Sequence, residues 1–181
     1  MSDEMVVRQC APTLASIKTG SLFNAPFDSE EEMRAAVREL NGKLRKHGIR
    51  VIPFRYLSGR GLIYLYRPDC LARDLCDRKA LELLRECGYT QTEPNRCLSE
   101  LKKRLCTQKD FPHEIGLFLG YPPRDVDGFM HCREQCLLCG LWKVYHDPDS
   151  AQEQFTKCNA CTQCLLARIR SGWRLEELAV G

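Results

Sequence analysis

The segment that decides the fold class is VIPFRYLSGRGLIYLYR, residues 51–67. Its two halves, residues 51–57 and 62–67, are rich in β-branched and aromatic side chains, which are typical of β-strands. Residues 58–61, Ser-Gly-Arg-Gly, separate the halves with the small residues that tight turns require. The segment therefore predicts an antiparallel hairpin. Pro53 has no N–H to donate to a neighbouring strand, so the first strand is expected at a sheet edge or with a bulge.

Helical and strand patterns surround this hairpin. Ser29 and Glu32 form a capping box, which marks the start of a helix. The apolar residues of this helix recur every three to four positions: Met33, Ala36, Val37, Leu40 and Leu44. Residues 141–145, Leu-Trp-Lys-Val-Tyr, alternate as a third strand does. We therefore expect an α+β fold, in which a small, mostly antiparallel sheet of hairpin 51–67 and strand 141–145 packs with several helices.

The composition is that of a folded globular chain. Of 181 residues, 44% are hydrophobic and 28% are charged, which excludes a disordered or collagen-like protein. No apolar stretch approaches the roughly 20 residues that cross a bilayer. The acidic start, residues 1–5, lacks the features of a secretory signal. We expect a single domain over residues 1–181, with a cysteine-rich C-terminal part at 131–165, in the cytoplasm and with no membrane association.

Cysteine is the unusual component, with 12 residues in the chain. A reducing compartment disfavours disulfides, so clustered cysteines are candidates for metal or redox chemistry. Four of them have the spacing C-x2-C-x18-C-x2-C: Cys136, Cys139, Cys158 and Cys161. This spacing falls within the range of four-thiolate zinc sites, because a two-residue spacer lets both sulfur atoms of a pair reach one ion. The sequence therefore predicts a zinc site at these four residues.

Two alternatives to this zinc site remain open. Adding Cys132 and Cys164 as extra ligands produces the spacings C-x3-C-x2-C and C-x2-C-x2-C, which also occur in iron–sulfur proteins. If instead the last helix is continuous, Cys158 and Cys161 lie on its apolar face and are core residues. The other cysteines, including Cys76, are expected to be packing residues.

Residues 114–129 resemble a DNA-binding helix-turn-helix, with Gly120 in the turn. The charge argues against DNA. Although the whole chain has a net charge of +3, residues 111–161 carry four Lys/Arg against seven Asp/Glu. Arg124 stands beside Asp125 in the second helix, so this helix would repel phosphate. We expect a structural helix pair here, and no nucleic-acid partner.

Four motifs spread over nearly the whole chain resemble a bacterial family of uncharacterised proteins, the domain of unknown function 3793 family. The motifs are CAPTLASIK at 10–18, FPHEIGLFLGYP at 111–122, DVxGF at 125–129 and CGLWKVY at 139–145. The resemblance implies a small cytoplasmic bacterial protein and supplies no activity.

Two kinds of function fit these residues. The first is a non-enzymatic metal-binding or thiol-redox accessory protein, which uses the C-terminal cysteines and acts with a protein partner that the sequence does not identify. The second is an enzyme whose site combines Cys10, His113 and Glu114, because a thiol beside a histidine oriented by a carboxylate is a workable nucleophile. Lys143 and Tyr145 would complete that site. We favour the first function, and a packing role for each residue of the second.

Overall fold

The computed structural model describes residues 1–107, 110–132 and 136–181. The sequence predicts one domain over the chain, and the contacts of the structure fall into two compact units. Unit 1 comprises Met1–Asp69 and Ala160–Gly181, and unit 2 comprises Cys70–Asn159. Helices combine with antiparallel strands in the described chain, so the predicted α+β class is confirmed.

Unit 1 is built around a three-stranded antiparallel sheet with the strand order β1-β3-β2. The strands are β1 (Gly20–Pro26), β2 (Arg50–Leu57) and β3 (Arg60–Tyr66). The predicted hairpin is therefore confirmed as β2 and β3. Pro53 lies on the edge strand β2, where the register shifts between Pro53 and Arg55, so its strand has both the edge position and the irregularity that proline requires.

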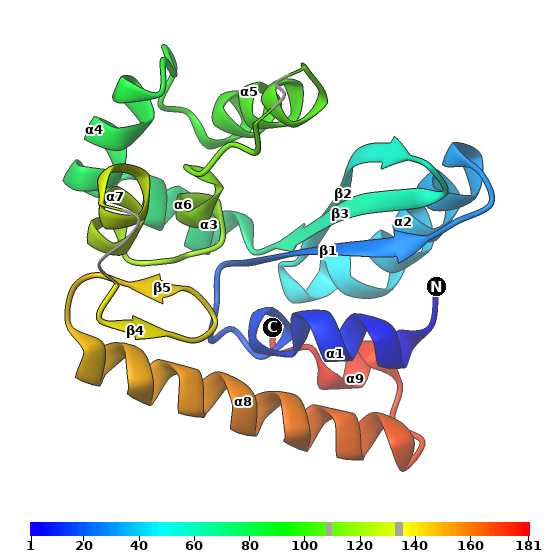
Figure 1. The fold of residues 1–181 in the computed structure, drawn as a ribbon. Helices are drawn as coiled ribbons and strands as arrows, with labels where there is room; N and C mark the ends of the chain where they lie inside the picture. The colour runs from blue at the N-terminus through cyan, green and yellow to red at the C-terminus, as the bar shows by residue number, and fades with distance from the viewer. Residues whose placement is uncertain (108–109, 133–135) are drawn as a thin grey trace. The chain divides into compact units, whose positions relative to one another are not determined.

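Helices close the core of unit 1 (Figure 1). They are α1 (Asp3–Leu14), α2 (Glu30–Leu44), the 3-10 helix η1 (Arg45–His47), α9 (Leu175–Leu178) and the C-terminal part of α8 (Pro148–Arg170). The predicted start of α2 is confirmed, because the Ser29 hydroxyl accepts a hydrogen bond from the backbone N–H of Glu32 at 3.1 Å. The predicted apolar stripe of α2 faces the core, with Met33, Val37, Leu40 and Leu44 buried.

Arg67 directly follows β3 and is buried, with 6% of its surface exposed. Its guanidinium donates to four backbone carbonyl oxygens, those of Thr13 (2.8 Å), Leu14 (2.7 Å), His47 (3.1 Å) and Val180 (2.7 Å). Two of these carbonyls end α1, and they also accept backbone hydrogen bonds, Thr13 from the Ser16 N–H at 3.3 Å and Leu14 from the Val180 N–H at 3.0 Å. Arg67 therefore joins the end of α1 to the C-terminal segment of unit 1.

Unit 2 consists of short helices and a small hairpin. Its elements are α3 (Pro68–Leu75) except for its first two residues, α4 (Arg78–Glu86), α5 (Pro94–Thr107), α6 (Ile115–Phe118), α7 (Pro123–His131), β4 (Leu138–Cys139), β5 (Lys143–Val144) and the N-terminal part of α8. Among residues 1–107, 110–132 and 136–181, no helix combines the length and the apolar character that a bilayer crossing requires.

The third strand is shorter than the predicted 141–145 and does not join the sheet of the hairpin 51–67. Only Lys143–Val144 forms a ladder, with Leu138–Cys139 as its antiparallel partner. The backbone N–H groups of the next two residues donate to Oδ1 of Asp125, at 2.8 and 2.9 Å. The strand ends at Val144 because a buried carboxylate takes the hydrogen bonds that a longer ladder would use.

Candidate functional site

The structure places two of the four predicted zinc ligands before and in β4, and the other two on α8. Cys136 precedes β4 and is half-buried, whereas Cys139 ends β4 and is exposed. Cys158 and Cys161 lie one turn apart on α8. Cys158 is 2% exposed, and the Cys161 thiol donates to the Ala11 carbonyl oxygen at 3.6 Å. The second pair thus occupies the inward face of α8, which is the position that the core-residue interpretation predicts.

The turn that follows Cys139 rests on α8. A Cβ atom at Gly140 would collide with the ring of Phe155, so only glycine fits there without a shift. Trp142 also packs edge-on against Phe155, with 4.5 Å between ring centroids. Because Phe155 precedes Cys158 by three residues, the hairpin that carries Cys139 contacts α8 within one turn of Cys158.

The described cysteines nevertheless form no assembled metal centre. Within the part of the chain that the structure describes, no group of three or more His, Cys, Asp and Glu side chains is arranged to hold a metal ion. Cys132 and Cys164, the extra ligands of the prediction, are both exposed.

Cys10, the thiol of the predicted enzyme site, lies on α1 in the core of unit 1 with none of its surface exposed. Burial raises the pKa of this thiol to about 12. The thiolate, which is the nucleophilic form, is therefore scarce near neutral pH. His113 and Glu114 belong to unit 2.

Glu114 lies immediately before α6 and is buried, and its carboxylate contacts side chains from other segments of unit 2. The Tyr89 hydroxyl donates to Glu114 Oε1 at 3.1 Å, and Arg104 Nη1 lies 3.6 Å from the same oxygen. The Arg104 guanidinium also lies over the Tyr89 ring, 4.5 Å from its centroid. Burial, followed by the Glu114 charge, raises the pKa of Tyr89 above its ordinary value. The Glu114 carboxylate therefore anchors the segment before α6 to Tyr89 and to α5.

Residues of three of the motifs line a pocket in unit 2 with a volume of about 350 Å³. Its lining is mainly aromatic and aliphatic and consists of Phe111, His113, Ile115, Gly116, Tyr121, Asp125, Val126, Phe129, Trp142 and Lys143. Phe129 of α7 forms part of the wall. His113 packs edge-on against its ring with 5.0 Å between centroids, and Lys143 Nζ lies 5.7 Å from the ring centroid. We call this the Phe129 pocket.

Asp125 holds the hairpin side of the Phe129 pocket in place. It is 1% exposed, and its Oδ2 accepts a hydrogen bond from Trp142 Nε1 at 2.7 Å. Its Oδ1 accepts from the backbone N–H groups of Tyr145 and His146. Tyr121 stacks on the Trp142 ring with 5.0 Å between centroids. These contacts fix the Trp142 indole as part of the pocket wall.

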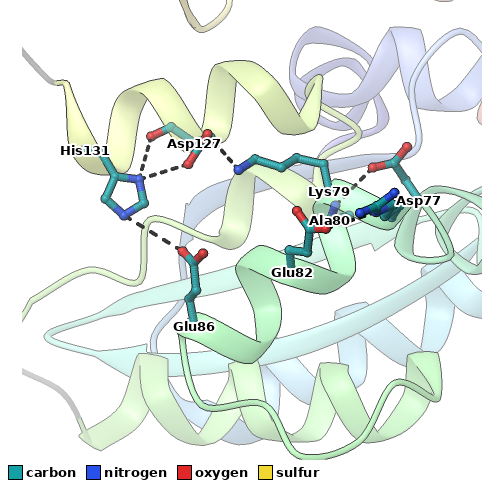
Figure 2. Close-up of polar contacts among 8 residues, drawn as sticks. Asp77, Lys79, Ala80, Glu82, Glu86, Asp127 and His131 are labelled. Atoms are coloured by element: carbon teal, nitrogen blue, oxygen red, sulfur yellow. Dashed lines mark hydrogen bonds and ion pairs between the residues drawn. The ribbon is translucent and has the colours of Figure 1, made fainter.

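A polar network holds α7 against α4 (Figure 2). Lys79 Nζ on α4 lies 2.9 Å from Asp127 Oδ2 on α7. On the other side of this carboxylate, His131 Nδ1 lies 2.9 Å from Asp127 Oδ1 and His131 Nε2 lies 3.9 Å from Glu86 Oε2. The network positions the helix that supplies Asp125 and Phe129 to the pocket.

The predicted helix pair at 114–129 is present as α6 and α7. The turn between them contains Gly120, whose φ of 76° is in the left-handed region that favours glycine. A Cβ atom at Gly116 would lie 2.8 Å from Val126 Cγ2, so glycine also permits the close approach of the two helices. The Asp125 carboxylate on the second helix points inward to Trp142. The pair therefore forms part of the pocket wall.

Sequence reasoning did not identify Asp125, Phe129 and Trp142 as site residues, although all three lie within the quoted motifs. The available signal was an acidic residue inside a motif that is otherwise mostly apolar. A buried carboxylate needs donors, and an indole N–H elsewhere in the chain is a suitable one.

The comparisons with known proteins identify a family. The family model described as "Protein of unknown function (DUF3793)" matches residues 6–179. No curated protein and no solved structure matches the chain.

Proposed function

Because the chain belongs to the DUF3793 family of proteins of unknown function, a description that names no activity, we propose a function from the geometry of unit 2. The chain is a small-molecule-binding protein, and its ligand places an apolar body in the Phe129 pocket. The observation that carries this proposal is the pocket itself, with a volume of about 350 Å³ and a mainly apolar lining. Binding sites for small molecules are typically concave, apolar and about 300–1,000 Å³ in volume.

The rigidity of the pocket wall supports this function. Trp142 is held by Asp125 and Phe155, and Gly116 lets α6 and α7 pack closely within the pocket wall. A preformed wall requires little ordering when a ligand enters, so more of the contact energy appears as affinity. The residues that line the pocket belong to three of the motifs that carry the family resemblance. This is consistent with a role beyond packing.

A neutral fluorescent probe tests this function. We would titrate N-phenyl-1-naphthylamine into the Trp173→Phe variant, in which Trp142 is the remaining tryptophan. Trp173 is 46% exposed, and phenylalanine retains a ring for its contact with Arg168. We expect saturable binding with energy transfer from Trp142 to the probe, because the indole lines the pocket.

A matched pair of variants locates the binding. Phe111→Ala removes a pocket-lining ring that is 46% exposed, and Leu141→Ala removes an apolar side chain of the same unit that is 42% exposed and lies outside the pocket lining. We expect Phe111→Ala to weaken binding about fivefold, from roughly 1 kcal/mol of lost apolar contact, and Leu141→Ala to leave it unchanged. Absence of binding to the folded protein, or equal effects of the two variants, would contradict the proposal.

A second candidate function is thiolate binding of zinc, with an iron–sulfur cluster or thiol-redox chemistry as its alternatives, by Cys136, Cys139, Cys158 and Cys161. The observation that favours it is the close packing of Gly140 against the Phe155 ring. This contact brings the turn after Cys139 to within one helical turn of Cys158. Four thiolates with this spacing complete a tetrahedral zinc shell when all four sulfur atoms reach the ion.

Metal analysis after anaerobic purification tests this second function. We expect one zinc per chain in the wild-type protein, loss of the metal in Cys139→Ser, and unchanged metal in the control Cys76→Ser, whose exposed thiol lies on a different segment. A visible absorption spectrum distinguishes an iron–sulfur cluster from zinc. A wild-type protein without metal would leave the four cysteines as packing and surface residues.

A further inference from the structure

We propose that the ligand of the Phe129 pocket is an apolar organic acid, whose anionic group is bound by the Lys143 ammonium beside the Phe129 ring. The inference rests on the proposed function, and it adds the charge of the ligand and the residue that recognises it.

The acidic side chain of the pocket is almost inaccessible to a ligand. Asp125 is the carboxylate in the lining, and both of its oxygen atoms already accept hydrogen bonds from Trp142 Nε1 and from two backbone N–H groups. It is 1% exposed, so a ligand meets almost none of its surface. A cationic ligand therefore finds no accessible carboxylate in the lining of this pocket.

Lys143 contributes an ammonium group to the lining of the pocket. Lys143 and His113 come from different segments, on β5 and before α6, and both contact the ring of Phe129. In the described part of the chain, the contact recorded for the Lys143 ammonium is this ring, and no carboxylate lies within 4.0 Å of it. The Lys143 ammonium is a charged donor, which suits a carboxylate or sulfonate oxygen.

The rest of the lining determines the shape of the ligand. It includes Ile115, Val126 and the Trp142 indole, which offer hydrophobic contact. An apolar body therefore fills the pocket while a single anionic group remains at the Lys143 side, where it stays partly hydrated. Such a division avoids burying a charge without partners, which is costly. The chemical class is an aromatic or branched aliphatic monoacid.

Two probes that differ in one anionic group test this inference. N-phenyl-1-naphthylamine is neutral, and 1-anilinonaphthalene-8-sulfonate carries the same ring system with a sulfonate. In the Trp173→Phe background at low salt, we expect the sulfonate probe to bind about five to ten times more tightly than the neutral probe. Added salt should reduce this advantage, because Lys143 is exposed and its charge is screened.

Lysine variants assign the effect to its residue. Lys143→Gln should remove most of the preference for the sulfonate, measured as the ratio of the two probe affinities in that variant. Lys157→Gln, a change at another exposed lysine of unit 2, is the matched control and should leave both affinities unchanged.

The outcomes separate the two proposals. If the two probes bind equally, if the neutral probe binds more tightly, or if Lys143→Gln leaves the preference intact, the acidic ligand is wrong while the apolar pocket stands. If neither probe binds the folded protein, the proposed function fails and this inference fails with it.

Discussion

Unit 1 and unit 2 each contain a buried charged side chain that binds backbone groups, and the charges have opposite signs. In unit 1, Arg67 donates to four carbonyl oxygens, two of which end α1. In unit 2, Asp125 accepts from two backbone N–H groups after β5 and from the indole of Trp142. The sign of each charge matches the backbone groups that it binds. These are acceptors in unit 1, two of them at a helix C-terminus, and donors beyond a strand end in unit 2.

The comparison also explains where the pocket lies. The core of unit 1 is one continuous cluster of apolar side chains from its sheet and helices, and Arg67 joins segments around it. Unit 2 has short elements, and its hairpin is fixed to α7 by the Asp125 carboxylate. A hairpin fixed by a few directional hydrogen bonds can border a pocket, whereas a continuous apolar core fills its interior.

The largest expected effect is the loss of the unit 1 charge. Arg67→Met removes the guanidinium from four carbonyl groups. Two of them keep a backbone donor, because the Ser16 N–H donates to Thr13 and the Val180 N–H donates to Leu14. The carbonyls of His47 and Val180 lose the donor that Arg67 supplies, and each unmet group costs about 1–3 kcal/mol. We expect unit 1 to lose about 4 kcal/mol of its free energy of unfolding, measured by hydrogen exchange of peptides from α1 and β3. The control is Arg34→Met, an exposed arginine on α2. If both variants lose the same stability, the Arg67 contacts are not important for unit 1.

The matching change in unit 2 is Asp125→Asn, and its expected effect is smaller because one oxygen atom remains. The new amide group must face either the Trp142 indole or the two backbone N–H groups, which are all donors. We expect a loss of about 2 kcal/mol in urea unfolding, from one or two unmet buried donors, together with weaker probe binding. Trp142 fluorescence in the Trp173→Phe background reports this transition. Asp149→Asn, at an exposed acid of α8, should have little effect, and an equal effect would argue against the role of Asp125.

Ser29 allows the same comparison with a neutral side chain, because it also accepts a hydrogen bond from a backbone N–H group. The Ser29 hydroxyl accepts from the Glu32 N–H at the exposed start of α2. Ser29→Ala should destabilise unit 1 by about 1 kcal/mol, the usual value of an N-cap. Ser99→Ala, in the middle of α5, should change stability by less than about 0.5 kcal/mol. A loss at Ser29 as large as that at Asp125 would show that burial of the charge contributes nothing extra.

The smallest expected effect is the pH dependence of the network in Figure 2. Partial burial alone raises the pKa of Asp127, but the hydrogen bonds and charges of Lys79 and His131 lower it overall below its ordinary value of 3.8. Since the folded pKa is below the unfolded one, the stabilisation is complete above pH values near the unfolded pKa and is lost as pH falls through the folded pKa. We expect a contribution below about 1 kcal/mol, because the pair is partly exposed. The stability difference between wild type and Asp127→Asn should shrink between pH 6 and pH 3, and a constant difference would contradict this assignment.

The sequence by itself determined the elements whose signals are local. The hairpin 51–67 follows from β-branched and aromatic runs around a Ser-Gly-Arg-Gly turn, and Pro53 predicted its edge strand and irregularity. The helix after Ser29 follows from a cap and an apolar period that lie within 16 residues. The inward position of Cys158 on α8 also follows from helical periodicity. These features need no distant partner, because turn chemistry and the side-chain period act between neighbours in the chain.

Only the tertiary structure decided which charged residues are buried and what they bind. Sequence reasoning used Asp125 as a surface charge that repels phosphate, and the structure buries it against groups 17 to 21 residues away. Arg67 binds the Val180 carbonyl, 113 residues away. The Phe129 pocket likewise joins residues from before α6, from α7 and from β5. A charged residue is buried only where the fold supplies matching partners, and those partners come from segments that local patterns do not connect.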